Sequence, residues 1–143
     1  MAVLRKVKST EVLMGKLKHG ADLLEEITNI CKDHDIQLGR IEAFGAVKKA
    51  RLGFYNQKTR EYQDLTLDRP FEITKLIGNI SLKDSNPIVH AHLTLADENG
   101  SVYGGHLMTG TIIFACEIIL QIFDGESFER KFDQETGLPL WYI

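Results

Sequence analysis

The sequence predicts an α+β protein in which one main helix near the N-terminus packs against a largely antiparallel β-sheet. Apolar residues recur at spacings of three and four between Ala21 and His34, and this is the period of one helix face. After Leu38, runs rich in β-branched and aromatic residues alternate with turn residues, which is typical of strands that follow one another in a meander. One helix beside such a sheet defines the α+β class.

The length and composition are those of an ordinary globular protein. At 143 residues the chain fits a single domain, 1–143, that buries roughly 68–70% of its unfolded surface. A hydrophobic fraction of 43% and a charged fraction of 26% argue against intrinsic disorder and low complexity. With 17 basic and 20 acidic residues, the net charge is −3, so the protein is not built around a basic field for nucleic acid.

Cysteine usage and the apolar runs favour a cytoplasmic protein. Cys31 and Cys116 form no CxxC motif and have apolar neighbours, so we expect buried free thiols in a reducing compartment. The first residues contain no apolar run long enough for a signal peptide. The longest apolar stretch, 112–122, is interrupted by polar residues and is too short to span a bilayer. We therefore expect no membrane partner.

The helix is predicted over residues 21–34. Its apolar stripe comprises Leu23, Leu24, Ile27, Ile30 and Cys31. Its first turns contain the acidic residues Asp22, Glu25 and Glu26, whose negative charges interact favourably with the positive end of the helix dipole. Gly39 marks the end of this region.

Turn residues divide the rest of the chain into predicted strands. These strands cover 41–44, 50–55, 61–67, 71–81, 88–96, 101–108, 111–123 and 127–132. The run 111–123 is apolar on both faces, with Ile112, Phe114, Cys116, Ile118, Leu120 and Ile122 on one face and Ile113, Ala115, Ile119 and Phe123 on the other. Such a strand is covered on both faces, and one helix cannot cover both sides of the sheet. We therefore expect a second sheet layer or another subunit over the remaining face.

Three histidines lie on two successive predicted strands. His90 and His92 are two residues apart, so both side chains project from one face of the strand 88–96. The other face carries Val89, Ala91, Leu93 and Leu95 and is uniformly apolar. The histidines therefore point away from the packed side.

The turn after this strand decides where His106 lies. The segment Asp97-Glu98-Asn99-Gly100 suits a type I turn followed by a left-handed glycine, which makes a three-residue hairpin loop with a bulge. This loop pairs Asp97 with Ser101 and therefore His92 with His106. A two-residue Asn99-Gly100 turn would shift the register by one residue and move His106 to the opposite face.

In the first register, His90, His92 and His106 can converge on one ion, because cross-strand Cβ atoms are about 5 Å apart. Three neutral imidazoles without a thiolate suit zinc, with copper, nickel or iron as alternatives, and leave a fourth position open. Histidines on a strand can also be ordinary surface residues, and HxH alone is a weak signal. The register favours a metal site with zinc as the expected ion, whose affinity falls as the pH drops through about 6.5.

Other titratable residues carry weaker signals. His19 and His34 flank the helix, and we expect them to be exposed and without a role. Glu117 lies on the two-sided apolar strand, so it is either a buried carboxylate with a partner or a site group, and Glu72 raises the same question. We expect each ligating imidazole to donate its other N–H to an acceptor such as Glu117, Glu72 or a backbone carbonyl.

No motif assigns a reaction. The sequence contains no Walker A motif, no GxGxxG before a helix and no GxSxG elbow. Cupins follow their HxH with a glutamate four to five residues on, where this chain has Ala96 and Asp97. No catalytic residue is therefore assigned, and whether the protein is an enzyme stays open.

Several strings taken together resemble one family. They are Gly39-Arg-Ile-Glu-Ala-Phe-Gly-Ala-Val47, Phe71-Glu-Ile-Thr-Lys-Leu-Ile-Gly-Asn-Ile-Ser81, Pro87-Ile-Val-His-Ala-His-Leu-Thr-Leu95 and Gly104-Gly-His-Leu107. From about Val3 to Phe123 the chain resembles the PPC (plant and prokaryote conserved) domain in its stand-alone prokaryotic form. The resemblance implies a curved antiparallel sheet, assembly as a homotrimer, and metal at the positions matching His90, His92 and His106.

These observations leave three functions open. The first is a metal-binding homotrimer that binds or acts on a small molecule at an open three-histidine site. The second is a DNA-associated regulatory protein that uses the basic stretch 48–60 or the N-terminal lysines. Plant members of the class carry an AT-hook with an Arg-Gly-Arg-Pro core, which this chain lacks, so we do not expect sequence-specific DNA binding. The third is a purely structural trimerisation module.

Overall fold

The structure is a computed structural model that describes residues 2–143, and it confirms the α+β class. Its elements are β1 (Lys8–Lys16), α1 (Leu23–Asp33), β2 (Gly39–Asn56), β3 (Glu61–Leu67), β4 (Phe71–Lys83), β5 (Asn86–Ala96), β6 (Val102–Leu107), β7 (Ile112–Asp124), β8 (Arg130–Phe132) and β9 (Pro139–Trp141). The main sheet has the order β1-β7-β2-β4-β5-β6, with β3 paired to β2, and β8 and β9 form a small second sheet. These strand pairings are antiparallel, as predicted. Within residues 2–143, no helix is long and apolar enough to cross a membrane.

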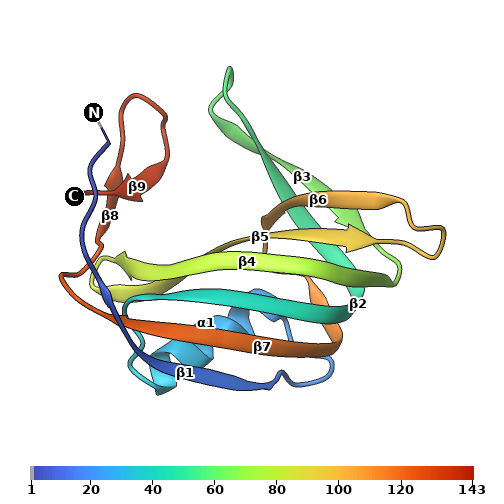
Figure 1. Cartoon of the computed structure of the whole chain (residues 1–143). Coiled ribbons are helices and arrows are strands. Elements are labelled where there is room, and N and C mark those ends of the chain that lie inside the picture. The colour runs from blue at the N-terminus through green and yellow to red at the C-terminus, as the bar shows by residue number, and fades with distance from the viewer. Residues whose placement is uncertain (1) are drawn as a thin grey trace.

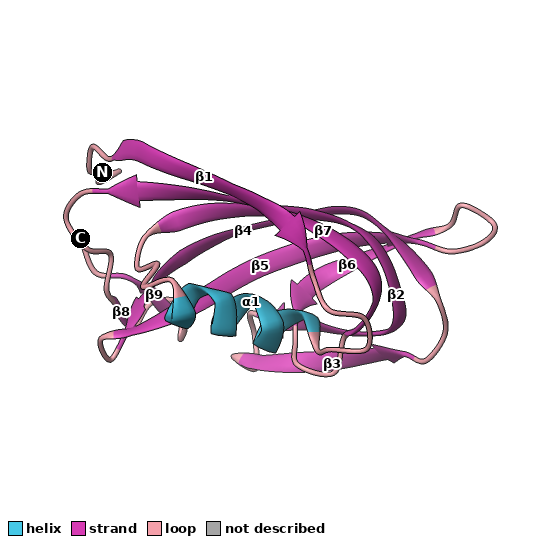
Figure 2. Ribbon diagram, turned by 90° about the horizontal axis from the view of Figure 1, so that it is seen from below, coloured by secondary structure: helices cyan, strands magenta, loops and turns pink. Residues whose placement is uncertain are grey.

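Helix α1 covers one face of the main sheet, and the sheet curves around it (Figure 1, Figure 2). The Asp22 side chain caps the helix by accepting a hydrogen bond from the Glu25 amide at 3.1 Å. Leu23, Ile27 and Cys31 are buried and belong to one apolar cluster with the sheet. The buried face of the helix thus agrees with the predicted stripe.

Strand β2 is longer than the sequence predicts. The runs 41–44 and 50–55 belong to one strand, which bends at an irregularity in its pairing next to Gly45. Gly45 has a φ of +141°, and a Cβ there would collide with the Ala115 carbonyl oxygen of β7, so only glycine permits this close approach. Beyond the bend, β2 pairs with β3 along one edge and with β6 along the other, so Gly53 lies between Asp64 of β3 and His106 of β6.

Strands β1 and β9 lie outside the predicted strands. Most residues of β1 are exposed, since it is the edge strand next to β7, and an edge strand lacks a strong apolar pattern. Strand β9 is only three residues long and pairs with β8. β1 forms by pairing with a segment far away in the sequence, and β9 is too short to show an alternating pattern. The local pattern of apolar residues therefore does not predict either strand.

The run 111–123 forms β7, but a bulge changes which of its side chains lie on the same face. The pairing with β2 shifts register next to Val47, which leaves Phe114 as an extra residue. Ile113 and Cys116 are therefore both buried, whereas Phe114 is 57% exposed. The prediction that Phe114 and Cys116 share one face is wrong, because an extra residue reverses the alternation of side chains.

Candidate metal centre

Strand β5 has one packed face and one open face. Its buried side chains are those of Val89, Ala91, Leu93 and Leu95. They join the apolar cluster that includes α1. His90 and His92 alternate with them and lie on the opposite face, as the period of a strand requires.

The turn between β5 and β6 is the predicted three-residue loop. Gly100 has a φ of +78°, the left-handed conformation that glycine adopts at little cost. The Asp97 amide donates to the Ser101 carbonyl at 3.0 Å, and the Asp97 carboxylate accepts from the Ser101 amide at 2.9 Å. His92 consequently pairs with His106. The predicted register is confirmed, and the two-residue alternative is excluded.

The three imidazoles meet on this open face. His92 Nε2 lies 3.3 Å from His90 Nε2 and 3.4 Å from His106 Nδ1. One nitrogen from each ring lies within 4.8 Å of the other two. Two nitrogens bound to one tetrahedral zinc at 2.0–2.1 Å are about 3.3 Å apart. The donor type and its spacing therefore fit a divalent transition metal.

Burial favours the neutral form of two of these rings. Burial, followed by the positive charge of Arg130 and the two neighbouring imidazoles, lowers the pKa of His90 to about 4. Burial is also the main cause that lowers the pKa of His106, ahead of His92 and Arg130. Neutral imidazole is the form that binds metal. Protons therefore compete for His90 at a lower pH than the value of about 6.5 for an ordinary histidine.

Arg130 of β8 lies against the histidines, and the sequence carries no signal for it. It is only 8% exposed. Its Nη2 donates to Asn79 Oδ1 at 2.8 Å and lies 3.4 Å from His90 Nδ1. Its Nε donates to Ser81 Oγ at 2.9 Å, and its Nη1 donates to the Pro139 carbonyl at 3.0 Å. Burial lowers the pKa of this guanidinium, because the low-dielectric surroundings disfavour its charge.

Tyr62 of β3 is a second neighbour that the sequence does not reveal. Its ring centroid lies 5.0 Å from that of His106. Burial is the largest cause that raises the pKa of the Tyr62 hydroxyl. Gly53 of β2 lies between β3 and His106, and its missing side chain leaves room for the Tyr62 ring, so only the tertiary structure shows the contact.

The carboxylates expected to orient the histidines lie elsewhere. Glu117 and Glu72 are both exposed, so the first of the two alternatives for Glu117, a buried carboxylate with a partner, is wrong. Glu117 belongs to β7, which is not adjacent to β5 or β6 in the sheet, and Glu72 pairs at the turn end of β5. The group next to the outer nitrogen of His90 is a guanidinium instead. His19 and His34 are exposed, as predicted.

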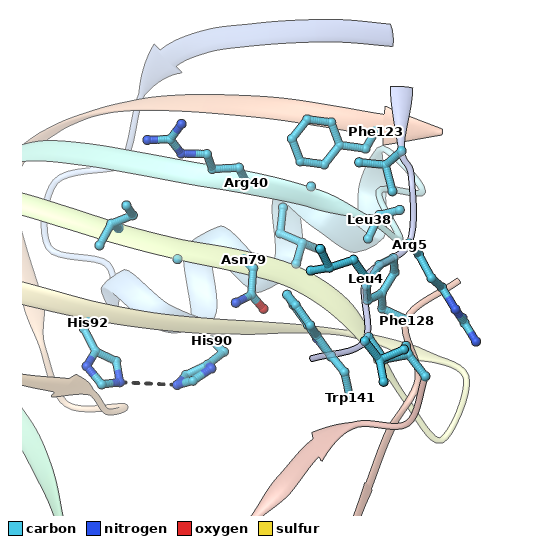
Figure 3. A pocket seen from close by; sticks show the side chains of 17 residues that line it. Leu4, Arg5, Leu38, Arg40, Asn79, His90, His92, Phe123, Phe128 and Trp141 are labelled. Atoms are coloured by element: carbon cyan, nitrogen blue, oxygen red, sulfur yellow. Dashed lines mark hydrogen bonds between the residues drawn. The ribbon is translucent and has the colours of Figure 1, made fainter. Parts of the chain in front are cut away.

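A cavity of about 650 Å³ opens beside His90 and His92. Its apolar lining includes Leu4, Leu38, Ile77, Phe123, Phe128 and Trp141. Figure 3 shows the two histidines and Asn79 on one side of this space and Trp141, Leu4 and Phe128 on the other. Arg40 also lines the cavity and is paired with Glu42. The three-histidine cluster therefore borders a space large enough for a small molecule.

The chain belongs to the Plants and Prokaryotes Conserved (PCC) domain family, whose model matches residues 4–124. The resemblance expected from the sequence is thus confirmed. The structure is similar to a metal-containing protein from Archaeoglobus fulgidus, with a TM-score of 0.95, 38% identity, and coverage of 99% of this chain and 100% of that one. It is also similar to a plant- and prokaryote-conserved protein from Pyrococcus horikoshii, with a TM-score of 0.93, 37% identity, and coverage of 99% and 98%.

Among curated proteins, the chain is 32% identical over 124 residues to the bifunctional protein GlmU of two Synechococcus strains. This match covers 85% of the chain but only 18% and 19% of those proteins. The chain thus spans less than a fifth of the length of these relatives.

Proposed function

We propose that the protein is a homotrimer in which His90, His92 and His106 of one chain bind a single zinc ion, with a fourth position open to a small molecule. The observation that carries this proposal is the convergence of three imidazole nitrogens within 4.8 Å of one another, with His92 Nε2 at 3.3 and 3.4 Å from the other two, close to the spacing of two ligands on a tetrahedral ion. The similar Archaeoglobus fulgidus protein, described as metal-containing, supports it further. A zinc ion held by three protein ligands would supply Lewis-acid chemistry to a molecule in the neighbouring cavity.

The metal content of protein purified without a histidine tag tests this proposal. We expect one zinc ion per chain in the wild type and in the control variant His19→Ala. We expect no stoichiometric zinc in His92→Ala, whose fold should persist because His92 is exposed and the apolar face of β5 is unchanged. Elemental analysis gives the stoichiometry, and circular dichroism reports the fold. A folded His92→Ala variant that keeps one zinc ion per chain would refute the ligand set.

Apolar side chains on the sheet face away from α1 support the proposed assembly. Val12, Met14 and Phe44 are 54%, 76% and 50% exposed. Their pairing with alternate residues of β7 places them on one face. Several large apolar side chains exposed on one face favour an interaction surface there, and the number three comes from the family resemblance. We expect a trimer by sedimentation, and a stable folded monomer at micromolar concentration would contradict this part of the proposal.

A further inference from the structure

Arg130 is a buried cation without an acidic partner in the part of the chain that the structure describes. The ion pairs there are formed by Arg5, Arg40, Arg51 and Arg69. The groups around the Arg130 guanidinium are all neutral, namely Ser81 Oγ, the Pro139 carbonyl, Asn79 Oδ1 and His90 Nδ1. Burying a charge without a counter-charge is costly. An anion from outside the chain would provide the missing counter-charge.

Metal binding by His90 adds a second reason to expect an anion at this place. Arg130 Nη2 is placed to donate to His90 Nδ1, which leaves the proton of the neutral ring on Nε2. When Nε2 binds a metal, the ring proton is on Nδ1, and two N–H donors then face each other across 3.4 Å. Ligating histidines usually donate this second N–H to a carboxylate or a carbonyl. One oxygen of a bound carboxylate could accept from both donors.

The space next to Arg130 is shaped for an acid that carries an apolar group. A cavity of about 470 Å³ is lined by Arg130, His90, Asn79 and Trp141, among others. It shares His90, Asn79 and Trp141 with the larger apolar cavity of about 650 Å³, so the two spaces are neighbours. The Arg130 guanidinium also lies 5.6 Å from the centre of the Trp141 ring. Arg5 and Arg40, which also line the larger cavity, are paired with Glu126 and Glu42, whereas Arg130 has no acidic partner among the described residues.

We propose that Arg130 and the Nδ1–H of the metal-bound His90 together bind the carboxylate of a small organic acid, whose apolar part lies in the larger cavity. The His90 half of this site rests on the proposed function, because metal at Nε2 puts the ring proton on Nδ1, whereas the Arg130 half exists in the chain itself. A guanidinium and a second N–H donor beside one ligand group favour an anion over a neutral molecule of the same shape. The apolar walls favour an aromatic or aliphatic acid over a highly charged one.

Calorimetric titration with benzoate, and with its neutral analogue benzamide, tests the proposal on the zinc-loaded protein. We expect benzoate to bind at least roughly tenfold more tightly than benzamide, as hydrogen bonds to charged groups imply. Arg130→Met should lose roughly tenfold or more in benzoate affinity while keeping its zinc. The matched control is Arg40→Met, which removes an arginine of the same cavity that is already paired with Glu42. It should change benzoate affinity by less than about threefold.

Equal binding of benzoate and benzamide would overturn the proposal, and so would unchanged benzoate affinity in Arg130→Met. Binding of neither compound would also overturn it, because the cavity is then closed or filled by a second copy of the chain. If Arg130→Met does not fold, the comparison of the two compounds on the wild type decides alone. If the wild type binds no zinc, the proposed function has failed, and the titrations are repeated without metal. A preference for benzoate that depends on Arg130 would then still support the anion site, and no preference would overturn it.

Discussion

The two faces of β5 have separate roles, so truncating the buried face should lower stability without removing the metal site. Leu95 is 0% exposed and pairs with Ile73 of β4 and Tyr103 of β6. Leu95→Ala removes about three methylene equivalents, which at about 0.8 kcal/mol each is about 2.4 kcal/mol of transfer free energy. The cavity left behind raises the expected loss of unfolding free energy to about 3–4 kcal/mol.

Urea unfolding followed by circular dichroism measures this loss. The protein concentration is held fixed, because any assembly couples to stability. The midpoint should fall at unchanged slope, and the folded variant should bind as much zinc as the wild type. The matched control is Thr94→Ala on the open face of the same strand, where the side chain is exposed and the change should stay within about 0.5 kcal/mol. A loss below about 1 kcal/mol for Leu95→Ala, or a loss of zinc in the folded variant, would refute this reasoning.

Three further predictions concern the site and the core. Without metal, the unfolding free energy should fall as the pH decreases from about 6.5 toward 4, because His90 has a folded-state pKa of about 4 and is protonated more readily when unfolded. Urea unfolding at several pH values should show a smaller decrease of the unfolding free energy in His90→Gln than in the wild type. An equal decrease would contradict the attribution of this pH dependence to His90. Gly78→Ala should lower both thermal stability and zinc content, since a Cβ there would lie 2.5 Å from the His90 carbonyl oxygen. In the control Gly15→Ala, the added Cβ meets nothing within 4 Å, so thermal stability and zinc content should both stay unchanged. Equal stability and zinc content in the two variants would contradict this prediction, because β4 would then have shifted to make room for the added methyl group. Burial raises the pKa of Cys31 to about 12 and that of Cys116 to about 11, so neither thiol should react with a disulfide reagent at about pH 8 until urea unfolds the protein, and rapid reaction of the native protein would contradict this.

The convergence of the three histidines could be predicted from sequence because every contact that creates it is local. The alternation of side chains on a strand places His90 and His92 on one face. The turn residues 97–100 then set the pairing of His92 with His106, which are only 14 residues apart. The faces of β7 could not be predicted in the same way, because one extra residue at Phe114 reverses the alternation.

By itself, the sequence determined the fold class, the apolar face of α1 and the hairpin that brings the histidines together. Only the tertiary structure decided what surrounds them. Arg130 is 40 residues from His90 in the chain. The segment that contains Arg130 is held near the site by a backbone hydrogen bond, which the Leu82 amide donates to the Phe128 carbonyl at 2.9 Å. The alternation of apolar and polar residues predicts which face of a strand a side chain occupies. Which other segment packs against that face depends on the packing of the whole chain. For this reason the donor atoms of the site follow from the local sequence, while the cation beside them follows from the fold.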